Sequence, residues 1–240
     1  MLNYGWRILM TFSWVFFCTY NNAVAQSKVS NKYGLLVIKD INILQKETEL
    51  NPGKRMIDLR RFIPGIVFDL KYATPDNFMH ERLYPPIKTT YLRLPAATAL
   101  KKVAAELDRL NLGIKIFDAY RPYSVTEKMW KVVKDDRYAA DPATGSGHNR
   151  GASVDLTIID LKTKKELPMG TGFDNFTDTA HQGFTGLPKE ILKNRNVLKS
   201  VMEKYGFIAL KTEWWHFYLA DSANYELLDL SFAELKKLDR

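Results

Sequence analysis

Two short segments of the sequence hold residue types that can bind and use a metal ion. The first runs from Ser146 to Asp155 and also contains His148. The second, from Glu213 to His216, adds another carboxylate and another imidazole. Two imidazoles and one carboxylate are a common ligand set of a catalytic zinc site, which keeps one position open for water. The remaining carboxylate is then available as a general base.

The spacing predicts a role for each of these side chains. Three of them fill the ligand positions of one zinc ion per chain: His148, Asp155 and His216. Glu213 is the expected base, which takes a proton from water as it attacks a carbonyl and passes that proton to the leaving amine. The other two of the four histidines match no pattern and are interpreted as surface residues of polar loops: His80 and His181.

The local sequence also predicts how these side chains reach one point. Asp155 lies inside a predicted strand, and Gly151 lets the preceding loop bend so that His148 folds back over that strand. Glu213 and His216 are three residues apart, so in a regular strand they would face opposite sides. We therefore expect Glu213 to lie in a loop or bulge before the strand begins.

Arg121 is a further candidate, because it follows another predicted strand, at 114–117. It stands in the run from Asp118 to Pro122, which can fix it at the end of that strand. The guanidinium could point into a cleft and stabilise the oxyanion that forms when water attacks a peptide carbonyl. The residues leave a second interpretation open, a structural ion pair between Arg121 and Asp118.

Helices and strands mix along the chain without a regular alternation, which favours an α+β fold. We expect a single domain whose helices pack on a mostly antiparallel central sheet that bears the zinc site. The clearest helix begins at Pro95, ends at Gly113 and has an apolar face made of Leu100, Val103, Ala104, Leu107 and Leu110. Other predicted helices lie at 124–133 with Ser124 as N-cap, at 188–205 and at 232–238. Predicted strands lie at 66–70, 114–117, 154–159 with a return strand after 162–165, 207–210 and 215–219.

The first 25 residues are interpreted as a secretory signal peptide. Arg7 precedes the apolar stretch 8–20, and Ala23-Val24-Ala25 forms a cleavage site before Gln26. The stretch is too short to span a bilayer comfortably. An uncleaved anchor is the alternative, and attachment of a lipid at Cys18 is disfavoured by the bulky residues before it. We expect an exported protein, periplasmic or extracellular, with no stable membrane span after cleavage.

Cleavage would leave 215 of the 240 residues, which is enough for one domain with a sizeable core. It would remove Cys18, the only cysteine, so that any metal must use nitrogen and oxygen ligands. Loss of Arg7 lowers the net charge from +8 to +7, and no nucleic-acid-binding module is evident. We divide the chain into a signal peptide at 1–25, a leader at 26–55 and a catalytic domain at 56–240.

Several motifs together resemble the zinc D-alanyl-D-alanine dipeptidases, the family that includes the vancomycin-resistance dipeptidase. The resemblance covers about residues 56–220 in the family's order. It rests on Asp69–Thr74 with Asn77-Phe78, Asp118–Pro122, Ser146–Asp155, Met169–Asp174 and Glu213–His216. D,D-carboxypeptidases belong to the same metallopeptidase clan. Two departures are Ser153, where the family usually has Ala, and the segment 84–90, which follows the family only loosely.

The resemblance implies the zinc ligands and the base that the spacing predicts: His148, Asp155 and His216 as ligands and Glu213 as base. It also implies roles for three further residues. It implies that Arg121 stabilises the transition state. It also places Ser146 and Asp174 near the ammonium group of the substrate. A carboxylate at that point suits a dipeptide, which brings a free cationic amine into a small pocket.

The expected partner is therefore a small dipeptide, D-Ala-D-Ala or a similar D,D-dipeptide from cell-wall metabolism. The alternative is a D,D-carboxypeptidase or peptidoglycan endopeptidase that uses the same metal site in an open groove. The segment 170–176 with Asp174 favours the dipeptidase. A non-catalytic wall-binding domain that keeps the metal is a third possibility, but binding alone would not need Glu213.

Overall fold

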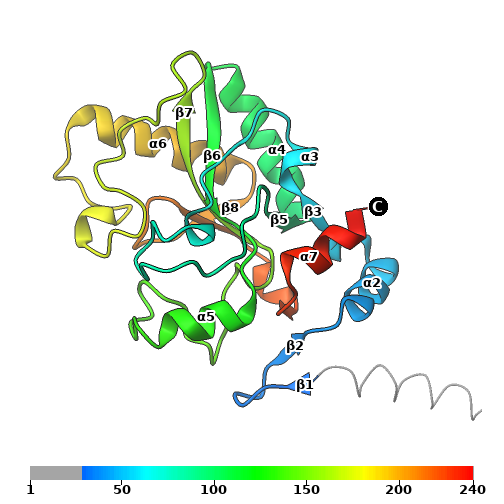
Figure 1. The fold of residues 1–240 in the computed structure, drawn as a ribbon. Coiled ribbons are helices and arrows are strands. Elements are labelled where there is room, and N and C mark those ends of the chain that lie inside the picture. The colour runs from blue at the N-terminus through cyan, green and yellow to red at the C-terminus, as the bar shows by residue number, and fades with distance from the viewer. Residues whose placement is uncertain (1–28, 240) are drawn as a thin grey trace, which may run out of the picture.

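The computed structural model describes residues 29–239, and the expected signal peptide at 1–25 lies outside them. Its centre is a five-stranded sheet with the order β4-β6-β7-β9-β8 (Figure 1). The strands are β4 (Val67–Phe68), β6 (Leu112–Asp118), β7 (Ser153–Asp160), β9 (His216–Leu219) and β8 (Phe207–Ala209). β7 is the middle strand and is buried along nearly its whole length, because both faces of the sheet are covered.

The strand directions make this sheet mixed. β6, β7, β9 and β8 pair in antiparallel fashion, but β4 lies parallel to β6 and pairs Val67 with Lys115. The expected mostly antiparallel sheet is therefore corrected to a mixed one. Apolar patterns indicate which face of a strand is buried but not its direction. The long connection from β4 to β6 contains a helix, and such a crossover permits a parallel return.

Two helices cover one face of the sheet, α4 (Leu94–Asp108) and α6 (Lys189–Lys204) (Figure 1). The predicted apolar face of α4 is confirmed for its buried residues Leu100, Val103 and Leu107. Leu110 is 55% exposed because the helix ends before it. The prediction that Gly113 ends the helix is wrong, because Gly113 lies within β6. Asn111 instead adopts the left-handed conformation after the helix, with φ 57°.

Helix α5 (Tyr123–Trp130) begins two residues earlier than an N-cap at Ser124 would place it, and it ends before residue 133. Ser124 is not its N-cap, since the residue before the helix is Pro122, which offers no side-chain cap. The carboxylate of Asp229 accepts the backbone N–H of Ser124 at 2.9 Å. A contact with a distant residue thus replaces the local cap that the sequence spacing indicated.

Residues 29–55, which belong to the segment expected as a leader, contain several regular elements. Among them are β1 (Val29–Ser30), β2 (Leu36–Ile38) and α2 (Ile41–Leu50). β1 and β2 form a three-stranded sheet with β10 (Leu227–Leu228), in which β2 and β10 run parallel. Helix α2 buries Ile43 and Leu44 in the core. In Figure 1 these blue elements lie beside the red C-terminal ones.

The remaining elements are short. They are the antiparallel pair β3 (Met56–Asp58) and β5 (Tyr91–Arg93), helices α3 (Leu59–Phe62) and α7 (Phe232–Leu235), and 3-10 helices at Pro52–Lys54, Lys71–Ala73, Asp178–Ala180, Ser222–Asn224 and Lys236–Asp239. The predicted return strand after 162–165 is reduced to one bridge between Ile159 and Glu166. Within residues 29–239, none of the helices has both the length and the apolar character that crossing a membrane requires.

Candidate metal centre and active site

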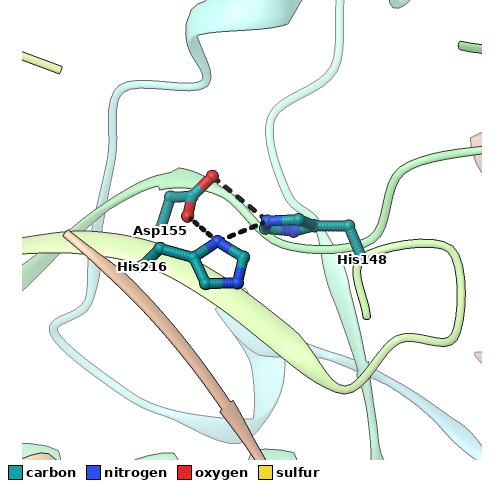
Figure 2. Close-up of side chains that lie close together, drawn as sticks. All are labelled: His148, Asp155 and His216. Atoms are coloured by element: carbon teal, nitrogen blue, oxygen red, sulfur yellow. Dashed lines mark hydrogen bonds and ion pairs between the residues drawn. The ribbon is translucent and has the colours of Figure 1, made fainter. Parts of the chain in front are cut away.

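Asp155 and His216 face each other across two neighbouring strands. They are register partners in antiparallel β7 and β9, so their side chains leave the same face of the sheet. Asp155 Oδ1 lies 2.9 Å from His216 Nδ1. His148 enters from the loop before β7, and its Nε2 lies 3.3 Å from Asp155 Oδ2 and 3.2 Å from His216 Nδ1. Figure 2 shows the three side chains converging, with their donor atoms within 4.8 Å of one another.

Two glycines shape the loop that carries His148. Gly151 has φ 67°, a conformation that side chains disfavour, and its N–H donates to the carbonyl of His148 at 3.1 Å. A Cβ atom on Gly147 would lie 2.0 Å from Ser153 Oγ, so the loop runs too close to β7 for a side chain. The expected return of His148 over the strand is confirmed. The buried hydroxyl of Ser153 makes no hydrogen bond with any described residue.

The surroundings favour the metal-binding forms of the three side chains. His148 Nδ1 lies 2.6 Å from the carbonyl oxygen of Ala119, which can only accept. Nδ1 therefore carries the hydrogen, and Nε2 presents a lone pair to the cluster. Burial opposes ionisation of Asp155, but the neighbouring imidazoles outweigh it and hold its pKa below the ordinary value. Burial lowers the pKa of His216 and so favours its neutral form.

This donor set fits a zinc ion, because two imidazole nitrogens and one carboxylate oxygen are the usual number of protein ligands at a catalytic zinc. The cluster lies in the wall of a cavity of about 210 Å³, and helices α4 and α6 contribute no lining residue. The site is therefore on the other face of the sheet from these helices. The cavity brings together all seven residues that the sequence analysis selected: Arg121, Ser146, His148, Asp155, Asp174, Glu213 and His216.

Glu213 lies in the turn between β8 and β9, three residues before the strand that carries His216. The expected irregularity is confirmed, and it lets both side chains reach one cavity. Glu213 Oε2 is 3.8 Å from His216 Nδ1. Burial, together with the negative charges of Asp155 and Asp174, raises the pKa of Glu213 well above its ordinary value. A carboxylate in such surroundings holds a proton more readily than one in water.

Arg121 combines the two interpretations that its sequence position left open. Its Nε and Nη2 both donate to Asp118 Oδ2, at 3.0 and 2.8 Å, so the ion pair exists. The guanidinium also lines the cavity, with Nη2 3.8 Å from Asp155 Oδ2. Tyr84 donates its hydroxyl to the other oxygen of Asp118 at 2.9 Å, and Arg121 lies over the ring of Tyr72. The guanidinium is thus fixed from behind while it faces the cavity.

Asp174 and Ser146 line the same cavity from separate loops. Asp174 has φ 57°, an uncommon conformation for a residue with a side chain, and its carboxylate accepts the hydroxyl of Tyr72 at 3.0 Å. Burial and the charge of Asp155 raise the pKa of Asp174 to about 8. Ser146 Oγ accepts the backbone N–H of His148 at 3.1 Å. Separate loops therefore add an acidic group and a hydroxyl to the cavity that contains the metal-binding cluster.

Three side chains that hydrogen-bond to the polar groups of this site were not selected from the sequence, namely Tyr72, Tyr84 and Asn149. Tyr72 lies in a family-like segment, which was a usable signal, whereas Tyr84 lies in the segment that departs from the family. Asn149 is buried, and its side chain accepts the N–H of Ser146 at 2.9 Å and donates to the carbonyl of Arg121, also at 2.9 Å. Only the folded structure reveals these partners. The other two histidines stay outside the cluster, His80 exposed and His181 partly buried.

Comparison with known proteins agrees with these motifs. A family described as D-ala-D-ala dipeptidase matches residues 53–237. The D-alanyl-D-alanine dipeptidase of Escherichia coli (strain K12) is 34% identical over 178 residues, which cover 74% of this chain and 91% of that protein. The enzyme of the same name from Enterococcus faecalis (strain ATCC 700802 / V583) is 29% identical over 182 residues, or 68% and 90% of the two chains.

A solved structure, that of the LD-carboxypeptidase LdcB, covers 88% of this chain and 97% of its own, with 17% identity and a TM-score of 0.40. That likeness is too weak to carry an argument. The family match is different, because it spans most of the chain and includes every segment that lines the cavity. The resemblance that the motifs indicate is confirmed, and the chain belongs to the D-Ala-D-Ala dipeptidase family of peptidases, which are hydrolases.

Proposed function

We propose that this chain is an exported zinc dipeptidase that hydrolyses D-Ala-D-Ala or a similar small D,D-dipeptide. One observation carries the proposal: a single cavity contains a metal-binding cluster, a buried carboxylate, a guanidinium and an acidic group on separate elements. The cluster would hold the metal, and the buried carboxylate would act on the attacking water. The guanidinium would face the peptide carbonyl oxygen, and the acidic group would face the ammonium group of a zwitterionic dipeptide. The names of the relatives support the same substrate.

His148, Asp155 and His216 would hold the zinc ion. Bound zinc polarises a carbonyl and lowers the pKa of its water from near 16 to about 7. Glu213 takes the proton of the attacking water and delivers it to the leaving amine. The raised pKa of Glu213 suits both steps, because a carboxylate of low pKa would hold the proton from water too weakly to carry it to the amine.

Arg121 would stabilise the oxygen that becomes negative as water adds to the peptide carbonyl. Its guanidinium is always charged, and its contact with Asp118 leaves part of its hydrogen-bonding edge for the cavity. Asp174 and Ser146 would receive the ammonium group of the substrate. A cationic amine beside Asp174 would favour the charged carboxylate and so lower its pKa from about 8.

The size of the cavity favours a dipeptidase over a carboxypeptidase or an endopeptidase. About 210 Å³ lies below the roughly 300–1,000 Å³ of cavities that take drug-sized ligands. The deciding experiment compares release of D-alanine from D-Ala-D-Ala and from a stem pentapeptide, alongside L,L and L,D dipeptides, with and without a chelator. We expect turnover of the D,D-dipeptide that the chelator abolishes. Faster turnover of the pentapeptide would establish the alternative.

A non-catalytic wall-binding role is tested by Glu213→Ala. The variant should retain zinc at wild-type stoichiometry, since Glu213 is not one of the proposed ligands, and it should lose hydrolysis. Glu213→Gln is the matched variant, because it keeps the shape of the side chain and loses only its basicity. Turnover that survives in both variants would remove Glu213 from the role of base.

Export is part of the proposal, and its support is the signal-like sequence at 1–25. An exported dipeptidase would salvage or trim dipeptides released from the cell wall. N-terminal sequencing of the protein recovered from cells tests the processing. A start at Gln26 is expected, whereas a start at Cys18 would mean a lipoprotein and an intact Met1 would mean that no cleavage occurs.

A further inference from the structure

Residues 30–38 lie before the part of the chain that the family matches, which begins at residue 53. This segment, here called the N-terminal brace, is linked through Tyr123 and through β10 to the loop at 142–149, which carries Ser146 and His148. Gly145, Ser146, Gly147 and His148 of that loop line the cavity. Two separate sets of contacts connect the brace to the loop.

The first connection is a chain of hydrogen bonds through a buried tyrosine. Asn31 Nδ2 donates to the hydroxyl of Tyr123 at 2.8 Å, and that hydroxyl donates to the carbonyl of Pro142 at 2.7 Å. A phenol has a single hydrogen, so its donation to Pro142 leaves its oxygen to accept from the amide. Because the amide of Asn31 donates, it does not compete with Pro142 for the phenol hydrogen, and it helps to hold Tyr123 in the orientation that binds the start of the loop.

The second connection runs through strand β10. β2 pairs with β10, where Val37 is the partner of Leu227. The next residue, Leu228, donates its N–H to the carbonyl of Asn149 at 2.9 Å. Leu227 also packs against the backbone of Gly145 so closely that a Cβ there would lie 2.5 Å from its Cδ2.

The end of the loop is linked in turn to the catalytic side of the cavity. The side chain of Asn149 accepts the N–H of Ser146 and donates to the carbonyl of Arg121. Val37, Tyr123 and Leu227 form a small buried cluster of their own, apart from the main core. A change in the hydrogen bonds of this cluster should therefore alter the loop without unfolding the sheet.

We propose that the N-terminal brace positions the cavity wall, and that Asn31 and Tyr123 are positioning residues for substrate binding at Ser146. The part that concerns substrate rests on the proposed dipeptidase function. The part that concerns the loop does not. The brace acts on the loop at Pro142 and Gly145, whereas the ring of His148 is held separately by the carbonyl of Ala119, so the effect falls on binding more than on the chemical step.

The variant that tests this inference is Asn31→Asp. The carboxylate keeps the oxygen that accepts the N–H groups of Tyr33 and Leu35, so the local turn is retained. It has no N–H to donate to Tyr123. We expect KM for D-Ala-D-Ala to rise about three- to tenfold, the range for one lost hydrogen bond, while kcat changes less than about twofold. Tyr123→Phe removes both bonds of the chain and should act in the same direction.

A second readout does not depend on activity. Hydrogen–deuterium exchange of the zinc-loaded protein should become faster at 142–149 in Asn31→Asp and stay unchanged in β6 and β7. Asn194→Asp is the matched control, since it makes the same change in an amide that donates to the Pro168 carbonyl outside the cavity.

The outcomes separate the two proposals. Unchanged KM and unchanged exchange at 142–149 would overturn the brace. Faster exchange in a protein whose wild type does not cleave D-Ala-D-Ala would support the brace at the loop and reject the dipeptidase. An equal loss in Asn194→Asp would mean that the effect is general destabilisation, which also overturns the positioning role.

Discussion

Arg121 and His148 are held by partners that do not themselves line the cavity. Asp118 orients Arg121, and the hydroxyl of Tyr84 occupies the oxygen of Asp118 that the guanidinium leaves open. The carbonyl of Ala119 similarly fixes the tautomer of His148. Such second contacts determine the direction of a functional group, because a single bond to a long side chain leaves it free to rotate.

Tyr84→Phe tests the positioning of Arg121. The ring contacts with Tyr72 and Phe232 remain, and only the hydrogen bond to Asp118 is lost. Since Arg121 is proposed to act on the transition state, kcat should fall about tenfold with little change in KM. In an Arg121→Ala background the same change should have almost no further effect on kcat. A full tenfold loss in both backgrounds would show that Tyr84 acts independently of Arg121.

Asp174 makes the stability of the metal-free protein depend on pH. Its folded pKa of about 8 is above the ordinary 3.8, so between these values the native state keeps a proton that the unfolded chain releases. The free energy of unfolding therefore falls as the pH rises from about 4 to 8. Urea unfolding in chelator at pH 5 to 8 should show a smaller decline for Asp174→Asn than for wild type. Parallel pH profiles would contradict the raised pKa.

At the scale of elements, the site depends on two irregular connections between regular strands. The turn between β8 and β9 releases Glu213 from strand alternation, and the glycine loop before β7 returns His148 over Asp155. β7 and β9 supply the fixed positions, since their register places Asp155 opposite His216. The strands thus set the distance between two of the proposed ligands, and the connections add His148 and Glu213.

Gly151→Ala tests the glycine loop. At φ 67° the new side chain should cost roughly 1–2 kcal/mol of unfolding free energy, and it would also displace the flexible end of Met56. Zinc affinity should fall as well, because the loop carries His148. Gly183→Ala is the control, with open space around its Cα and no left-handed φ. Thermal unfolding and zinc titration of both variants provide the measurement, and equal behaviour of the two would contradict the strain.

Elements with local signals were predictable from the sequence, and those set by distant contacts were not. The helix at 188–205 is confirmed as α6, because its apolar spacing belongs to the helix itself. Ser124 was wrong as an N-cap because Asp229, more than a hundred residues away, accepts its N–H. The parallel placement of β4 was equally out of reach, since it depends on the path of the connection to β6.

At the scale of the whole molecule, the fold brings together cavity residues from five parts of the chain, at 72–78, 121–129, 136–155, 174 and 210–216. The motifs identified the members of the site because chemistry restricts which side chains can serve there. The motifs did not identify Tyr84 or the N-terminal brace. Both act by contacting other residues of the protein and supply no reactive group to the site. The two strands of the segment expected as a leader were also missed, because they are short and form a sheet only with the distant strand β10.

Because the proposed metal ligands converge only in the folded chain, zinc should stabilise the whole molecule. A ligand that binds the native state at about 100 times its Kd adds about 2.7 kcal/mol, which corresponds to a rise in Tm of about 5–10 °C for a domain of this size. His216→Ala should lose that rise, since it removes a ligand from β9. His80→Asn should keep it, because His80 is exposed and Asn tolerates its φ of 53°. Calorimetry with zinc and with chelator distinguishes these outcomes, and an equal shift in all three proteins would place the stabilising ion elsewhere.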